Sequence, residues 1–213
     1  MNLAILGPQG SGKGTQAQRL ADNYQLLRLE TGKILREMAE SDNPDAEEIK
    51  KTMLDGKLVS DNTLQKIIEE RIESNSGSGI IFDGTPRNLI QYELIKNILK
   101  KRGENLDKVI YLEIPEETTI ERLSTRRTCE RCNRIYNLHT NPPPTPEKCE
   151  CGGNLRQRSD DTPEAIAKRL NEYRQATVPV LISAKAEGKL VEINGTKSIN
   201  EVYDEITKML NLN

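Results

Sequence analysis

The chain has 213 residues and a mass of 24.0 kDa, enough for one substantial hydrophobic core with smaller excursions from it. Its net charge of −2 and pI of about 5.7 count against sequence-independent nucleic-acid binding, which needs a basic surface. The apolar run at 2–6 is too short for a signal peptide, and no run reaches membrane-spanning length. We therefore expect a cytoplasmic globular protein that binds neither nucleic acid nor membrane and needs no obligatory protein partner.

Short apolar runs alternate with helical patterns along the chain. The runs at 3–6, 26–29, 80–82, 109–114 and 190–193 predict strands. Helices are expected at 13–24, behind Ser60 or Asp61, around 89–99, and as one long helix that starts at Thr162 and Pro163. A capping box formed by Ser198 and Glu201 predicts a last helix.

This alternation predicts an α/β fold with a central parallel five-stranded sheet and helices on both of its faces, a three-layer arrangement. Two segments do not fit the alternation. Residues 31–59 have a helical pattern without a strand, and residues 128–159 are rich in Pro, Asn, Arg and Cys. We expect both to stand over the carboxyl edge of the sheet, where such folds bind ligands.

A glycine-rich segment, Gly-Pro-Gln-Gly-Ser-Gly-Lys at 7–13, joins the first predicted strand to the first predicted helix. This context is typical of a phosphate-binding loop, since glycines let the backbone N–H groups approach a phosphate and the helix dipole lies behind them. An ordinary glycine-rich turn is the alternative interpretation. The candidate phosphate-binding residues are Gly10, Ser11, Gly12, Lys13, Gly14 and Thr15.

All four cysteines, Cys129, Cys132, Cys149 and Cys151, lie within one segment. In a protein without an export signal this clustering favours one structural zinc ion, while two disulfides or four free thiols are the alternatives. The second pair has only one intervening residue, so the chain must bend there for both sulfurs to reach one ion. Gly152 and Gly153 directly after it permit such a turn.

The segment Gly-Lys-Gly-Thr-Gln at 12–16 resembles adenylate kinases and their nucleoside monophosphate kinase relatives. Three further segments extend the resemblance: Thr-Gly-Lys-Ile-Leu-Arg at 31–36, Gly-Lys-Leu-Val at 56–59, and Asp-Gly-Thr-Pro-Arg at 83–87. The match runs from residue 2 to the final helix. It implies a P-loop fold and reversible phosphoryl transfer from ATP to AMP, with magnesium; other nucleoside triphosphates are also expected as donors.

The resemblance also implies roles for individual residues. The AMP site would comprise Thr31, Arg36, Lys57, Leu58, Val59, Gly84, Thr85, Pro86, Arg87, Gln91, Arg158 and Arg169, with the backbone of Gly56. The ATP site would comprise the phosphate loop with Arg122, Arg126, Ile135, Tyr136 and Lys197, and Asp83 would hold magnesium through water. Catalysis would rest on Lys13, Arg36, Arg87, Arg126, Arg158, Arg169, Asp160 and Asp161, because transferring a phosphoryl group requires its charge to be stabilised.

The same resemblance divides the chain into parts. The core would comprise residues 1–30, 60–121 and 162–213, the helical insert 31–59 would bind the monophosphate, and residues 122–161 would form a small zinc-ribbon-like lid. Three residues depart from the family pattern. Lys33 stands where an Asp is common, Thr85 where an aromatic is usual, and Gln9 where a Pro is usual.

Three other functions compete with this prediction. The first is a kinase for UMP, CMP or GMP, although Gln91 and the insert at 31–59 favour AMP. The second is a nucleotide-gated module whose zinc ribbon binds nucleic acid, which the acidic pI disfavours. The third is a GTPase-like switch, which lacks support because the sequence has no Asn-Lys-x-Asp segment to read guanine.

Overall fold

A computed structural model describes residues 1–42, 44–55, 57–73 and 79–212, and a parallel sheet of five strands lies at its centre. In spatial order the strands are β2 (Leu27–Glu30), β3 (Ile80–Asp83), β1 (Asn2–Leu6), β4 (Lys108–Glu113) and β8 (Leu190–Asn194). Each comes from one of the predicted apolar runs. Such runs suit strands of a parallel sheet because both faces of that sheet are covered. The predicted fold class is therefore confirmed.

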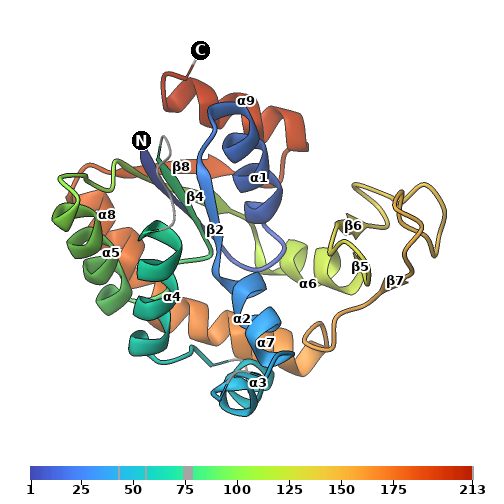
Figure 1. The fold of residues 1–213 in the computed structure, drawn as a ribbon. Helices are drawn as coiled ribbons and strands as arrows, with labels where there is room; N and C mark the ends of the chain where they lie inside the picture. Colours follow the sequence, from blue (N-terminus) through green and yellow to red (C-terminus); the bar gives the residue numbers. More distant parts are fainter. Residues whose placement is uncertain (43, 56, 74–78, 213) are drawn as a thin grey trace.

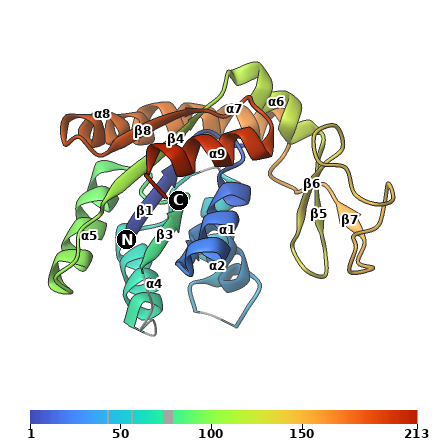
Figure 2. The same ribbon diagram turned by 90° about the horizontal axis from the view of Figure 1, so that it is seen from above.

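Helices cover both faces of this sheet, and Figures 1 and 2 show them on opposite sides of it. One group consists of α4 (Asp61–Glu73), α5 (Leu89–Lys101) and α8 (Val178–Ala186), and the other of α1 (Lys13–Tyr24) and α9 (Ile199–Met209). Phe82 of β3 packs in the first core and its neighbour Ile81 in the second. This follows from the pleat, since successive strand side chains point to opposite faces.

The helix starts follow the expected capping chemistry. The Thr162 hydroxyl accepts a hydrogen bond from the Ala165 N–H at the start of α7 (Pro163–Glu172). Ser198 and Glu201 form the predicted capping box of α9. Ser60 accepts from the N–H of Thr63, so Ser60 rather than Asp61 caps α4. Each cap supplies a partner to an N–H group that the helix itself leaves unpaired.

The long helix expected after Thr162 is divided into three parts. It continues from α7 through a π-helical segment (Tyr173–Thr177) into α8. The wider turn brings the Thr177 hydroxyl to the backbone oxygen of Arg87, to which it donates a hydrogen bond of 2.9 Å. Segments of this kind are frequent near functional sites.

Two segments extend from the core, as Figures 1 and 2 show. The first holds α2 (Thr31–Ala39) and α3 (Ala46–Leu54), whose small core includes Leu35 and Ile49 and packs against Ile67 of α4. The second follows α6 (Glu116–Ser124) and contains a three-stranded antiparallel sheet in the order β6-β5-β7. Its strands are β5 (Arg126–Cys129), β6 (Ile135–Asn137) and β7 (Leu155–Arg156). The sequence patterns did not predict α6 or these short strands.

Candidate active site

A cavity of about 810 Å³ opens at the carboxyl edge of the central sheet, between the helical insert and the small antiparallel sheet. Its size is in the range of small-molecule sites. The predicted site residues that line it are Gly10, Ser11, Gly12, Lys13, Gly14, Thr15, Arg36, Leu58, Asp83, Gly84, Pro86, Arg87, Arg122, Arg126, Ile135, Tyr136, Arg158, Arg169 and Lys197. Segments far apart in the sequence therefore meet at one cavity.

The phosphate loop lies between β1 and α1 and turns at Gly10 and Gly12, whose φ angles are 80° and 92°. The Lys13 ammonium donates hydrogen bonds of 2.8 Å to the backbone oxygens of Gly7 and Pro8. Burial lowers the pKa of Lys13 to about 7. A phosphate beside this ammonium would favour its charged form. The loop is thus arranged to receive an anion at the start of a helix.

Arginines from several elements face the same cavity. They are Arg36, Arg87, Arg122, Arg126, Arg158 and Arg169. Burial, together with the charge of neighbouring arginines, lowers the pKa of Arg87 to about 10 and that of Arg158 to about 9. So much positive charge is costly to bury without an anion. The cavity therefore suits a ligand with several negative charges.

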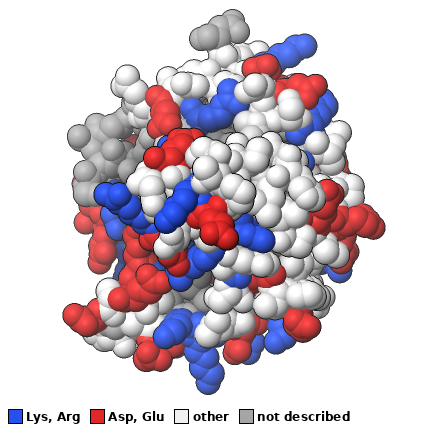
Figure 3. Space-filling model, turned by 90° about the vertical axis from the view of Figure 1, so that its right-hand side faces the viewer, with Lys and Arg blue, Asp and Glu red and all other residues white. Residues whose placement is uncertain are grey.

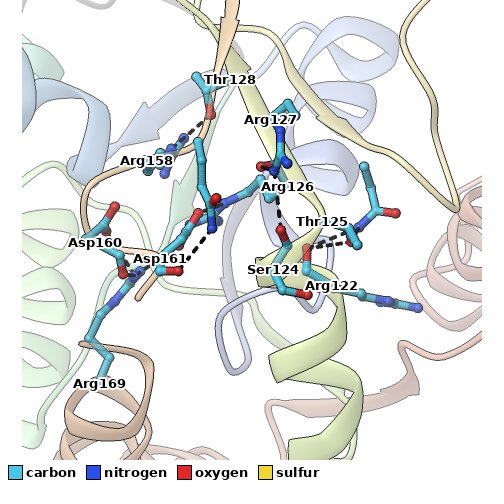
Figure 4. A network of polar contacts seen from close by, with 12 residues as sticks. Arg122, Ser124, Thr125, Arg126, Arg127, Thr128, Arg158, Asp160, Asp161 and Arg169 are labelled. Carbon is cyan, nitrogen blue, oxygen red and sulfur yellow. Dashed lines mark hydrogen bonds and ion pairs between the residues drawn. The ribbon is translucent and has the colours of Figure 1, made fainter. Parts of the chain in front are cut away.

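Two aspartates hold these arginines in place, as Figure 4 shows. Arg126 donates to both oxygens of Asp161, at 2.8 and 2.5 Å. Arg169 forms an ion pair of 2.9 Å with Asp160. Neither aspartate is among the described residues that line the cavity. Their side chains orient the arginines, while Thr162 caps the following helix.

Several residues predicted for the AMP site lie outside the lining. Thr31 and Thr85 are buried, and their hydroxyls form a hydrogen bond of 2.7 Å with each other. The side-chain oxygen of Gln91 accepts from the N–H of Arg87 at 2.8 Å. Lys57 and Val59 also lie outside the lining, and Gly56 is outside the described residues. The contacts with AMP predicted for these residues remain predictions.

Two residues predicted to contact the ATP base, Arg122 and Lys197, lie where the phosphate loop meets the loop after β8. The Arg122 guanidinium donates to the backbone oxygens of Gly10 and Gly195, at 3.2 and 2.9 Å. The ammonium of Lys197 pairs with Glu205 at 2.7 Å. These contacts bring the loop after β8 against the phosphate loop.

The sequence patterns did not single out two charged residues of β2, Glu30 at the cavity and Arg28 behind it. Glu30, the last residue of β2, lines the cavity, and its register partner on β3 is Asp83. Arg28 binds both carboxylates, at 2.9 Å to Glu30 and 2.6 Å to Asp83. The alternation Leu-Arg-Leu-Glu in this strand is a usable signal, because it sets both charged residues on one face of the sheet.

Comparison with known proteins agrees with this geometry. The family model described as adenylate kinase matches residues 5–189. The chain belongs to the adenylate kinase family. Adenylate kinases of Methanothrix thermoacetophila and Archaeoglobus fulgidus are 42% and 39% identical to it, each over 99% of this chain and 98% of the relative. The adenylate kinase of Syntrophomonas wolfei is 38% identical over 99% of both chains.

Three residues that depart from the adenylate kinase pattern, Lys33, Thr85 and Gln9, occupy different positions around the cavity. Lys33 lies on α2 outside the lining and pairs with Glu37 at 3.8 Å, on the exposed side of that helix. Thr85 is buried and contacts Thr31 through its hydroxyl. Gln9 lines the cavity. None of these three replacements removes a predicted catalytic group.

The four cysteines converge in the small antiparallel sheet. Their sulfurs all lie within 4.8 Å of one another, with 3.5 Å between Cys129 and Cys151 and between Cys132 and Cys149. Sulfurs around one zinc ion would be about 3.8 Å apart, given Zn–S bonds near 2.3 Å and tetrahedral geometry. The donor set therefore fits zinc.

The bend expected between the second pair of cysteines is present. The N–H of Gly152, at φ 80°, donates to the backbone oxygen of Cys149 at 2.8 Å and closes a tight turn. A Cβ on Gly153 would lie 2.7 Å from the sulfur of Cys129, so this position has no room for a side chain. The hydroxyl of Tyr136 lies 3.3 Å from the sulfur of Cys149. This contact, together with hydrogen bonds from the backbone of Cys151 and the neighbouring thiols, lowers the pKa of the Cys149 thiol to about 6. A thiolate is the form that binds zinc.

Proposed function

We propose that this chain catalyses the reversible transfer of a phosphoryl group from ATP to AMP. The observation that carries the proposal is a single cavity in which the phosphate loop faces arginines of the helical insert, the lid and α7. Such a cavity brings two polyanions together, which their mutual repulsion otherwise opposes. Membership of the adenylate kinase family supports the same reaction.

In this proposal the side chains act by position and charge. The phosphate loop holds the ATP phosphates, and Lys13 stays with the phosphoryl group as it passes to the acceptor. Arg36 and Arg87 hold the AMP phosphate. The planar guanidinium groups match phosphate oxygens and do not deprotonate at neutral pH, so they stabilise charge on the transferring group.

Three further arginines would act from the lid side of the cavity. Arg126, Arg158 and Arg169 would surround the equatorial oxygens of the transferring group. Asp160 and Asp161 keep Arg169 and Arg126 in position through the ion pairs described above. Preorganised charge of this kind is usually the largest contribution to catalysis at such sites.

The site fits magnesium. Asp83 is a carboxylate on the cavity wall, and Mg²⁺ in nucleotide sites is commonly held through one or two carboxylates, several waters and the substrate phosphates. When bound with ATP, magnesium neutralises part of the phosphate charge. Asp83 would accept hydrogen bonds from its waters. The four cysteines would hold one zinc ion that stabilises the lid and takes no part in the reaction.

The proposed division of the chain follows from these roles. Residues 31–59 would bind the monophosphate, residues 122–161 would form the lid, and residues 1–30, 60–121 and 162–213 the core. Within the described residues, no helix has the length and apolar character that crossing a membrane requires. We expect the protein to act in the cytoplasm.

A nucleic-acid-binding zinc ribbon is less well supported. Figure 3 shows acidic side chains interspersed with basic ones over the face that carries the lid. A nucleic-acid surface would instead gather basic side chains along one stripe or patch.

A coupled assay tests the proposal and separates it from its rivals. ADP formation is measured with ATP and each of AMP, UMP, CMP and GMP in turn. We expect AMP to be the preferred acceptor. The variant Lys13→Met should lose about 10³-fold or more in kcat, by analogy with other charged groups at phosphoryl-transfer sites. Lys100→Met, an exposed change on α5, is the control. Preference for another monophosphate, or near wild-type turnover of Lys13→Met, would refute the proposal.

A further inference from the structure

Arg28, which has no role in the proposed mechanism, binds the Asp83 carboxylate. Asp83 and Glu30 are register partners on adjacent parallel strands, so they lie side by side on the same face of the sheet. Both line the cavity. Arg28 does not; it lines a smaller hollow of about 230 Å³ to which Glu30 also contributes. Arg28 therefore reaches the carboxylates from the side away from the substrates.

All three nitrogens of the Arg28 guanidinium have a polar partner at this position. Its Nε and Nη2 both donate to Oδ2 of Asp83, at 3.2 and 2.6 Å, and Nη2 lies 2.9 Å from Oε2 of Glu30. Its Nη1 donates to the side-chain oxygen of Gln18 at 2.7 Å. Nη2 would lie only 3.1 Å from a Cβ built on Gly14, so the group also packs against the phosphate-loop end of α1.

The contact with Arg28 matters because Asp83 is buried. The side chain of Asp83 is only 7% exposed, and a charged group removed from water to this extent is costly unless it has an opposite charge or a hydrogen-bond donor beside it. Arg28 provides that partner, and it also offsets the repulsion between the two neighbouring carboxylates. The hydrogen bonds that Asp83 accepts from described side chains all fall on Oδ2. Oδ1 is thereby left for other donors.

We propose that Arg28 is a positioning residue of the phosphoryl transfer, which holds the side chains of Asp83 and Glu30 side by side for the waters of ATP-bound magnesium. Glu30 then supplies a second carboxylate at the site, on β2, although Lys33 on α2 replaces the acid common in the family. This inference rests on the proposed function for its substrate. Arg28 acts on that substrate only through the carboxylates it holds.

The test compares ATP binding with and without magnesium, measured by calorimetry in the absence of AMP. In wild type, magnesium should tighten ATP binding. In Arg28→Gln the increase in ATP affinity caused by magnesium should be smaller by on the order of tenfold, the lower end of the effects seen when partners that orient metal-binding groups are removed. The affinity for ATP alone, measured in EDTA, should equal that of wild type. Arg28→Lys should recover part of the gain, because it keeps the charge but not the fork that spans two carboxylates.

A matched control and a second variant keep the result interpretable. Arg102→Gln removes another arginine from an ion pair, with Glu104 at 3.1 Å, and should leave the magnesium effect unchanged. If Arg28→Gln does not fold, Glu30→Gln replaces it and should reduce the gain in the same direction. In turnover assays, Arg28→Gln should need more magnesium for half-maximal rate, with the KM for AMP changed less than about twofold, since no AMP contact is lost.

Two outcomes would overturn the inference. One is an unchanged magnesium effect in a folded Arg28→Gln protein. The other is a larger effect, which would make Arg28 a competitor of the metal. Failure of the proposed function is a separate result: wild type would then form no ADP from ATP and AMP, whereas the calorimetric comparison would still test Arg28.

Discussion

At the scale of single residues, the charge of Lys13 is expected to change when ATP binds. In the free protein, burial lowers the pKa of Lys13 to about 7, so the ammonium is largely deprotonated at pH 8. Bound phosphates favour the charged form and raise this pKa again. ATP binding at pH 8 should therefore take up a proton, and this uptake should decline as the pH falls below 7, where Lys13 is already charged.

Calorimetry in buffers of different ionisation enthalpy measures this uptake. We expect close to one proton at pH 8 for wild type. Lys13→Met should take up far fewer protons on binding ATP. The difference between the two proteins removes the contribution of protons that bind to ATP itself. Equal uptake by the two proteins would show that Lys13 does not change its charge on binding.

Arg122 is expected to determine how strongly the protein selects the base of the donor triphosphate. Arg122 is anchored to the backbone of Gly10 and Gly195, and its flat guanidinium can stack on any base. We expect GTP to replace ATP as donor with a modest loss, while AMP remains the acceptor. The measurement is kcat/KM for each donor at saturating AMP. Discrimination above about a thousandfold, or some 4 kcal/mol, would contradict this expectation.

At the scale of single elements, we expect zinc binding by the cysteine cluster to depend on a tyrosine as well as on the four cysteines. The Tyr136 hydroxyl contacts the sulfur of Cys149 at 3.3 Å, and a donor to a metal-bound thiolate strengthens the site. Tyr136→Phe should weaken zinc binding by about tenfold, measured by competition with a chromophoric chelator. Tyr203→Phe on α9 is the control, and equal affinities for both would count against the contact.

We expect the same cysteine cluster to stabilise the proposed lid. Elemental analysis of purified protein should find about one zinc per chain, since four sulfurs close one tetrahedral site. Chelation should lower the melting temperature, because the lid is too polar to form a core of its own. A zinc content well below half an atom per chain, unaffected by added zinc, would refute the site.

The elements differ in how far the sequence predicts them. The core strands were predictable because short apolar runs of three to six residues between turn residues have few alternatives in a parallel sheet. The start of α7 was predictable from Thr162 and Pro163. The π-helical segment and the short lid strands were not, since β7 has only two residues and the lid depends on the cysteine cluster rather than on periodicity. Arg28 and Glu30 were not predicted as site residues, because polar residues that alternate with leucines are common on the exposed face of a strand.

At the scale of the whole molecule, the cavity lies between the proposed lid and the proposed monophosphate-binding insert, which we expect to move when substrates bind. The helical insert contributes Arg36 and Leu58 to the cavity, and the lid contributes Ile135 and Tyr136 from the other side. Substrates must enter between them, and water must be excluded during transfer. Two adenosines joined through phosphates should therefore draw the two parts together.

Small-angle scattering measures this closure. We expect the radius of gyration to fall when the bisubstrate compound saturates the protein. Adenosine, which lacks the phosphates that the arginines bind, is the control and should leave it unchanged. A constant radius with the saturating compound would argue against closure of the lid and insert.

The reaction itself provides the most direct test of the central claim. Phosphorus NMR of the protein with ATP, AMP and magnesium should show ADP appearing as both substrates fall, and ADP alone should yield ATP and AMP, because the transfer is reversible. ATP without AMP should remain intact. Formation of inorganic phosphate in place of ADP, or no change with both nucleotides present, would contradict the assignment of this cavity to phosphoryl transfer between ATP and AMP.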